Sequence, residues 1–301
     1  MPTVTAHDGV KLHYEEAGAG APVLFVHEFA GDWRSWEPQM RYFSRSYRCI
    51  TYSARGYLPS DVPKNPDSYS QDHWREDIRA VIQGLKLERP HVVGLSMGAM
   101  ATLHFGMKYC AKGGGIGARS LTLAGVGSGA HPATFDDFQK SSRANAQFIR
   151  KNGMAQFAAT YGHGGTRLQY LRKDPRGFAE YIRQLGEHSQ EGSANTMEGY
   201  QGRRPSLYAL TDAIGRVDVP VLILTGDEDE PCLEASVMLK RLIPQAGLAM
   251  LAQAGHGINL EEPALFNQLL ENFFHRVEAG TWGTRDPRSA AASIWGPTGK
   301  P

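Results

Sequence analysis

The sequence predicts an α/β fold with a mostly parallel central sheet, helices on both faces and an inserted helical cap. Short apolar runs alternate with helix-like stretches up to about residue 127 and again from residue 217. This alternation is typical of parallel sheets joined by crossover helices. Residues 128–216, between these two parts, have a helix-like pattern with recurring aromatic residues and no strand signal. We therefore expect a core of residues 1–127 and 217–278, a cap of 128–216 and a C-terminal tail of 279–301.

The first half of the chain is expected to supply most of the sheet. Two alternating runs within residues 3–17 flank Asp8-Gly9, a hairpin signal, and so predict an antiparallel edge. Residues 22–26 (PVLFV) form a continuous apolar run, which is typical of a strand buried on both faces. Apolar spacing and turn residues predict further strands at 48–52, just before residue 96 and at 120–125, and helices at 34–43, 71–85 and from residue 97 to about 109.

The alternation resumes after the expected cap. Residues 219–225 (VPVLILT) predict a buried strand, 232–242 a helix, 248–252 a strand and 263–277 a final helix. The tail of residues 279–301 is rich in turn residues and lacks periodicity. We expect it to be flexible or to be held on the surface by Trp282 and Trp295.

Charge and cysteine content limit the partners and the compartment. The 32 basic and 31 acidic residues nearly cancel, so no global field favours nucleic acid or an anionic membrane. The chain contains no apolar run long enough to span a bilayer and no signal-peptide pattern. Three widely spaced cysteines without a C-x-x-C motif indicate a reducing compartment, so a cytoplasmic location is expected. No pattern predicts a metal or cofactor, and homo-oligomerisation stays open.

The clearest motif is Gly94-Leu95-Ser96-Met97-Gly98, which follows an apolar pair and precedes a helix-like stretch. A G-x-S-x-G sequence in a strand-turn-helix setting lifts the serine hydroxyl above the end of a sheet. Ser96 is therefore the candidate nucleophile. The alternative is a glycine-rich turn without chemistry.

A serine nucleophile requires a base and a group that orients the base. His256 follows the last predicted strand, and the glycines on both sides leave its imidazole free to reach another loop. Asp227 and Asp229 follow the buried strand at 219–225, although a carboxylate there is also an ordinary helix cap. The chain order serine, aspartate, histidine matches the order that accompanies this turn.

These three blocks resemble the α/β-hydrolase fold family over about residues 3–277. The matching segments are GLSMG, PVLILTGDED and AGHGINLEEP, which correspond to the nucleophile, acid and histidine blocks of the family. The resemblance implies that Asp229 is the acid, with Asp227 as the second choice. It also implies an oxyanion hole made by the backbone N–H groups of Met97 and Phe29, and cofactor-free chemistry on a small molecule.

Two features depart from the family or stay undecided. His27-Glu28 stands where the family usually has His-Gly, which resembles the version in dienelactone hydrolases and adds a carboxylate near the site. His27 and Glu28 are therefore candidates for substrate contact. Three roles are open for Glu28: to face Ser96, to position water or to repel an anionic substrate. The alternative is an outward, salt-bridged Glu28. Residues 129–216 hold 12 Lys and Arg against 8 Asp and Glu, including Arg203-Arg204. This excess of positive charge favours a substrate with a carboxylate, or it is only a solvent-exposed surface of the cap without a binding role.

Together these features predict a serine hydrolase that cleaves an acyl bond, most simply a carboxylic ester, through an acyl-enzyme. A lactonase or a C–C bond hydrolase of aromatic catabolism would use the same triad. Serine at the turn argues against the dehalogenase and epoxide hydrolase branches that the fold resembles, because these use aspartate there. A ligand sensor with a vestigial triad is the alternative from another class.

Overall fold

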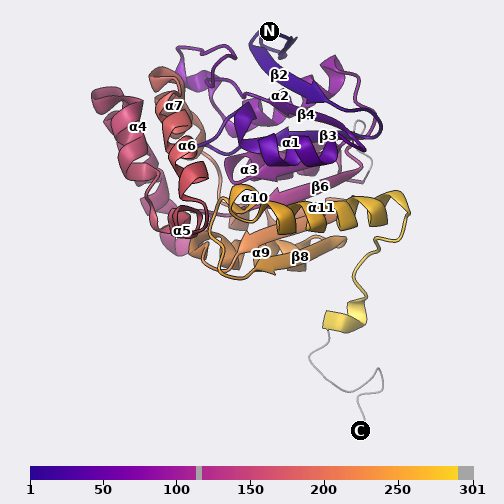
Figure 1. Cartoon of the computed structure of the whole chain (residues 1–301). Helices are drawn as coiled ribbons and strands as arrows, with labels where there is room; N and C mark the ends of the chain where they lie inside the picture. The colour runs from indigo at the N-terminus through magenta and orange to yellow at the C-terminus, as the bar shows by residue number, and fades with distance from the viewer. Residues whose placement is uncertain (113–116, 291–301) are drawn as a thin grey trace.

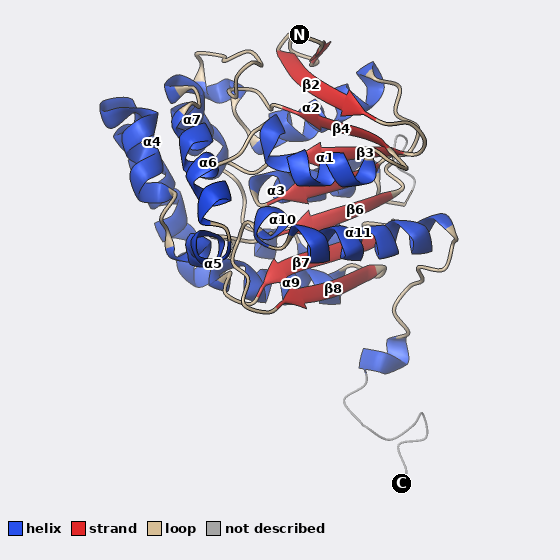
Figure 2. Ribbon diagram, in the orientation of Figure 1, coloured by secondary structure: helices blue, strands red, loops and turns tan. Residues whose placement is uncertain are grey.

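An eight-stranded sheet forms the centre of the computed structural model, which describes residues 1–112 and 117–290 (Figure 2). Its strand order is β1-β2-β4-β3-β5-β6-β7-β8. Only the pairs β1–β2 and β2–β4 are antiparallel, and the others are parallel. The strands are β1 (Thr3–Thr5), β2 (Lys11–Ala17), β3 (Pro22–Val26), β4 (Arg48–Tyr52), β5 (His91–Leu95), β6 (Ser120–Ala124), β7 (Val221–Gly226) and β8 (Ala246–Leu251).

Helices cover both faces of the sheet, which explains why every residue of β5, β6 and β7 is buried. In Figure 1, α1 and α11 lie in front of the strands. One buried cluster joins these helices to the sheet through residues such as Phe25, Phe43 and Phe273. A second cluster on the other face contains Trp74, Ile78 and many further side chains. The core helices are α1 (Glu37–Phe43), α2 (Gln71–Gly84), α3 (Met97–Tyr109), α9 (Glu230–Leu242), α10 (Ile258–Glu261) and α11 (Pro263–Glu278).

Helices α4 to α8 occupy the chain between β6 and β7, the stretch expected to form the cap. Figure 2 shows the arrowheads of β6, β7 and β8 pointing toward the side where α4, α5 and α6 lie. The cap therefore stands over the carboxyl ends of the parallel strands, where sites of α/β proteins gather. Its elements are α4 (Pro132–Tyr161), which is kinked at Gly153, α5 (Leu168–Lys173), α6 (Pro175–Gly186), α7 (Gln190–Asn195), α8 (Thr211–Gly215), the short helices η3 (Gly165–Arg167) and η5 (Leu207–Ala209), and the π-helix η4 (Thr196–Gln201).

The structure confirms the predicted fold class and adds short elements that the sequence pattern did not predict. The first predicted helix is divided into the 3-10 turn η1 (Trp33–Trp36) and α1, and a second short turn, η2 (Pro66–Ser68), lies between β4 and α2. Helix α10 was not predicted, because a single turn has too few residues to show periodicity. Among the described residues, no helix is both long and apolar enough to cross a membrane.

The first part of the tail is attached to the core. The indole Nε1 of Trp282 donates a hydrogen bond to the carbonyl of Gln245 at 2.8 Å, and its ring contacts Phe273 with the centroids 4.6 Å apart. A short turn, η6 (Pro287–Ala290), follows. Trp282 thus holds the tail where the sequence suggested, whereas Trp295 lies outside the described residues.

Candidate active site

Ser96 stands on a sharp turn between β5 and α3. Its backbone has φ 53° and ψ −113°, a conformation that side-chain-bearing residues rarely adopt. The flanking glycines are required by close packing, because a Cβ on Gly98 would lie 2.2 Å from the carbonyl oxygen of Val26 and one on Gly94 would lie 2.5 Å from that of Gly98. The strained turn presents the Ser96 hydroxyl at the carboxyl edge of the sheet.

His256 connects this hydroxyl to a buried carboxylate. The imidazole Nε2 lies 2.7 Å from Ser96 Oγ, and Nδ1 lies 2.7 Å from Asp229 Oδ2. Asp229 has no exposed surface, and it follows the buried strand β7. Three segments that are far apart in the sequence therefore form one continuous chain of hydrogen bonds.

The charges in this chain favour an ionised Asp229 beside His256. Burial disfavours a charged carboxylate, but attraction and hydrogen bonding to His256 leave the pKa of Asp229 below its ordinary value. Burial likewise favours a neutral imidazole, but the Asp229 carboxylate reverses this and raises the pKa of His256 well above its ordinary value. The pair is therefore arranged to accept a proton at Nε2 and to stabilise the resulting imidazolium.

Asp227, the second choice for the acid, has a different position. Its side chain is exposed, and its Oδ1 accepts a hydrogen bond from the backbone N–H of Ala254 at 3.1 Å. This bond ties the loop after β7 to the histidine loop. Of the two aspartates, only Asp229 contacts the imidazole.

Two backbone N–H groups are free to serve an oxyanion. Among the described residues, neither the N–H of Phe29 nor that of Met97 has a hydrogen-bond acceptor. The loop that carries Phe29 leaves β3 directly against the serine turn, since a Cβ on Gly98 would lie 2.5 Å from the carbonyl oxygen of His27. The carbonyl groups of both residues accept hydrogen bonds of 2.9 Å. The hydroxyl of Tyr57 donates to Phe29, and the hydroxyl of Tyr200, a cap residue, donates to Met97.

The side chains of His27 and Glu28 are buried and bound to other parts of the protein. His27 is fully buried, and its Nδ1 donates to the carbonyl of Glu28 at 2.6 Å while its Nε2 accepts from the N–H of Ala54 at 3.0 Å. Burial lowers the pKa of His27 to about 4. Glu28 is 2% exposed and forms an ion pair with Arg167 of the cap. Both side chains therefore fix the loop that carries Phe29, and a direct substrate contact by either one stays a prediction.

The short helix η3, which ends at Arg167, joins the cap to two loops of the core. The guanidinium of Arg167 holds Glu28 on one side and lies 5.2 Å over the ring of Tyr181 on the other. The preceding residue, Thr166, accepts a hydrogen bond from the backbone N–H of His256 at 2.9 Å. The short helix η3 therefore contacts the loop of the oxyanion donor and the loop of the base.

Most of the chain matches a known protein family. The model of the family described as alpha/beta hydrolase fold matches residues 21–263. The chain belongs to the α/β-hydrolase fold family. The predicted family and the predicted hydrolase class agree with this finding.

This α/β-hydrolase has relatives of several activities. It is 27% identical over 91% of its length to a Bacillus subtilis (strain 168) protein, 98% of which is covered, that is provisionally named as a 2-succinyl-6-hydroxy-2,4-cyclohexadiene-1-carboxylate synthase. It is 24% identical to 3-oxoadipate enol-lactonase 1 of Acinetobacter baylyi, with 91% of this chain and 97% of the relative covered. The fold is also that of a thermophilic esterase from Thermogutta terrifontis, with a TM-score of 0.79, 24% identity and coverage of 92% and 98% of the two chains.

A cysteine that sequence reasoning did not single out lies beside the base of this α/β-hydrolase. Cys232 Sγ is 3.9 Å from His256 Nδ1 and donates to the carbonyl of Gly125 at 3.3 Å. Asp229, Cys232 and His256 each offer an atom that could bind a metal, all within 4.8 Å of one another. A metal there would displace the Asp229–His256 hydrogen bond, so it would compete with the orientation of the base.

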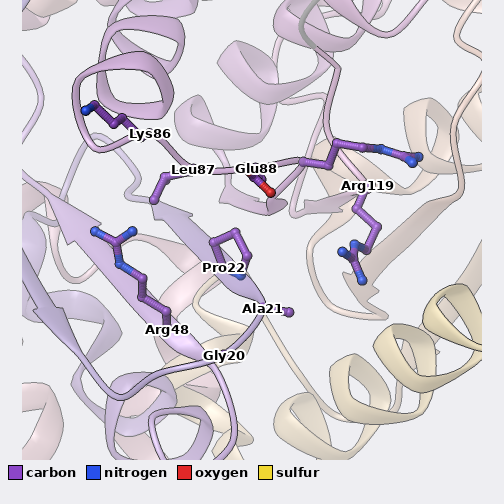
Figure 3. Close-up of a pocket in the computed structure, with 9 residues that line it drawn as sticks. Gly20, Ala21, Pro22, Arg48, Lys86, Leu87, Glu88 and Arg119 are labelled. Carbon is purple, nitrogen blue, oxygen red and sulfur yellow. The ribbon is translucent and has the colours of Figure 1, made fainter.

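A basic pocket of about 400 Å³ lies at the opposite end of the sheet, by the amino ends of β3 and β4 (Figure 3). Its lining includes Arg48, Lys86, Arg89 and Arg119. Arg48 is already paired with Glu16 at 2.8 Å. The pocket contains none of the residues around Ser96, so we exclude it from the candidate active site.

The Glu28–Arg167 pair supplies the first testable prediction. Glu28→Gln and Arg167→Met each leave one buried charge without its partner, and we expect each to lower the free energy of unfolding by about 3–5 kcal/mol. The double variant is expected to be destabilised less than the sum of the two single variants. Urea unfolding of all four proteins measures this coupling, and strictly additive losses would show that the pair does not act as a unit.

Proposed function

We propose that this α/β-hydrolase is a serine hydrolase that cleaves carboxylic esters through an acyl-enzyme. The observation that carries the proposal is the chain from Ser96 through His256 to Asp229, with both hydrogen bonds at 2.7 Å. The two free N–H groups of Phe29 and Met97 beside the serine support it further. These are the parts that acyl transfer requires: a nucleophile, an oriented base and donors for an oxyanion.

In the proposed mechanism, Ser96 Oγ attacks the ester carbonyl carbon while His256 Nε2 takes the hydroxyl proton. The N–H groups of Phe29 and Met97 donate to the tetrahedral oxyanion. His256 then gives its proton to the leaving alkoxide, and the acyl group remains on Ser96. Water then attacks the acyl carbon while His256 takes its proton, and the carboxylic acid leaves Ser96. Asp229 stays ionised throughout and holds the imidazole in the required tautomer.

A lactone is a second candidate substrate, and the similarity to 3-oxoadipate enol-lactonase 1 favours it. A lactone is a cyclic ester, so the same attack opens its ring and the leaving oxygen stays on the acyl product. Whether an open-chain ester or a lactone is the preferred substrate depends on the space beneath the cap.

The proposed location is the cytoplasm. The three cysteines are all free in the described part of the chain, which supports this location.

A substrate screen tests the proposal. The purified protein is assayed with p-nitrophenyl esters of increasing acyl length and with five- and six-membered lactones, at substrate concentrations far above that of the protein. We expect many turnovers per molecule on at least one ester or lactone. A single stoichiometric release followed by no further turnover would instead indicate a ligand sensor.

A further inference from the structure

Arg204 of the cap is a buried guanidinium without an acidic partner among the described residues. Three arginines are nearly or fully buried in the described part of the chain. Arg55 pairs with Asp77 at 2.6 Å, and Arg167 pairs with Glu28. Arg204 is 4% exposed and has no such carboxylate. Burying an unpaired cation is costly, so a protein that retains one needs a reason for it.

The contacts of Arg204 orient the side chain without neutralising it. One guanidinium nitrogen, Nη2, donates to the carbonyl of Ser128, and the group lies 4.4 Å over the ring of Phe138. Among the described residues, Nε and Nη1 have no hydrogen-bond acceptor. Burial lowers the pKa of this guanidinium. The guanidinium is thus held in place by Nη2, and Nε and Nη1 are left to bind another acceptor.

A short series of contacts connects Arg204 to the base through Ser128 and Cys232. Ser128 lies in the loop after β6, and its hydroxyl is 3.3 Å from the thiol of Cys232. That thiol is in turn 3.9 Å from His256 Nδ1. The guanidinium is therefore bound to the loop that borders the base, on the side of the sheet edge that the cap covers.

We propose that Arg204 binds a carboxylate carried by the substrate, so that preferred substrates are half-esters or lactones with a free carboxylate. A guanidinium offers two parallel N–H donors that match a carboxylate, and the ion pair is strong where water is excluded. The substrate would supply the counter-charge that the protein lacks. This inference rests on the proposed function, and it identifies the class of ester that the site accepts.

A matched pair of substrates tests the inference. The p-nitrophenyl half-ester of adipic acid carries a terminal carboxylate, and p-nitrophenyl 6-methylheptanoate has the same shape without the charge. The wild-type protein is expected to favour the half-ester. In Arg204→Gln we expect kcat/KM for the half-ester to fall by about 10- to 100-fold, mainly through KM, and kcat/KM for the neutral ester to change by less than about threefold.

The neighbouring arginine is the matched control. Arg203 is exposed and pairs with Asp67 at 2.6 Å, so Arg203→Gln removes the same charge from the surface of the cap. It should change neither activity by more than about twofold. Equal losses with both esters in Arg204→Gln, or no preference of the wild-type protein for the half-ester, would overturn the inference.

Two further measurements separate a binding role from a structural one. Arg204→Met removes the buried charge, and we expect its melting temperature to equal or exceed that of the wild type; a clear decrease would indicate a structural role. Adipate should raise the melting temperature of the wild type but not that of Arg204→Gln, whereas adipamide should affect neither. This binding measurement decides the inference even if no ester is hydrolysed, a result that would refute only the proposed function.

Discussion

Replacing Ser96 by alanine is expected to lower kcat on any accepted ester by about 10⁵-fold, because the variant loses the nucleophile and cannot form an acyl-enzyme. The residual rate should come from the oxyanion donors and from binding, which the substitution leaves in place. The turn itself is unchanged, so the melting temperature should shift by no more than about 2 °C. Steady-state rates with the best ester from the screen, corrected for spontaneous hydrolysis, measure the effect.

Ser128→Ala is the control for this substitution. Ser128 is a partly buried serine near the base, and its hydroxyl contacts Cys232 rather than His256. Removal of this hydroxyl should change kcat/KM by less than about fivefold. If Ser96→Ala kept the wild-type rate, or if Ser128→Ala lost as much activity as Ser96→Ala, Ser96 would not be the nucleophile.

Replacing Asp229 by asparagine is expected to lower kcat by about 10⁴-fold, the second largest effect. The amide fills the same space, but it no longer stabilises the imidazolium and it can hold His256 in the wrong tautomer. Asp227→Asn is the matched control, because Asp227 is exposed and its carboxylate accepts a hydrogen bond from the N–H of Ala254 and not from His256. A larger loss in Asp227→Asn than in Asp229→Asn would assign the acid to Asp227.

The pH dependence gives an independent measure of Asp229. The base must be neutral to accept a proton, so kcat/KM rises as the pH rises through the pKa of His256. Since Asp229 raises that pKa well above its ordinary value of 6.5, the acidic limb of the wild type should lie above pH 6.5. In Asp229→Asn this limb should move to lower pH. An unchanged limb would mean that another group controls it.

The core of the fold could be predicted from sequence because its signals are local. Strands such as 22–26 and 48–52 were predicted with the bounds that the structure has, since continuous apolar runs end at turn residues. Helix α9 begins at Glu230, two residues before the predicted start, because Pro231 occupies its first turn. Divisions within the cap could not be predicted, because the whole stretch is helix-like and its breaks depend on single capping residues such as Asp174 and Ser189.

The candidate site could likewise be predicted only in part. Ser96, Asp229 and His256 were singled out because each follows a strand at one edge of the sheet, so local sequence and topology bring them together. The partners of Glu28 and the neighbours of Arg204 could not be predicted. Glu28 and Arg167 are 139 residues apart, and their contact depends on how the cap packs on the core. Contacts between the cap and the core are therefore less visible in the sequence than residues that follow a strand within a recognisable motif.

Covalent trapping tests the central claim most directly. A fluorophosphonate loses fluoride when an activated serine attacks its phosphorus, and mass spectrometry of the digested protein locates the adduct. We predict one adduct per chain, on Ser96, formed in parallel with the loss of esterase activity and absent from Ser96→Ala. Loss of activity with the adduct on another residue, or complete labelling of Ser96 with activity retained, would contradict the account.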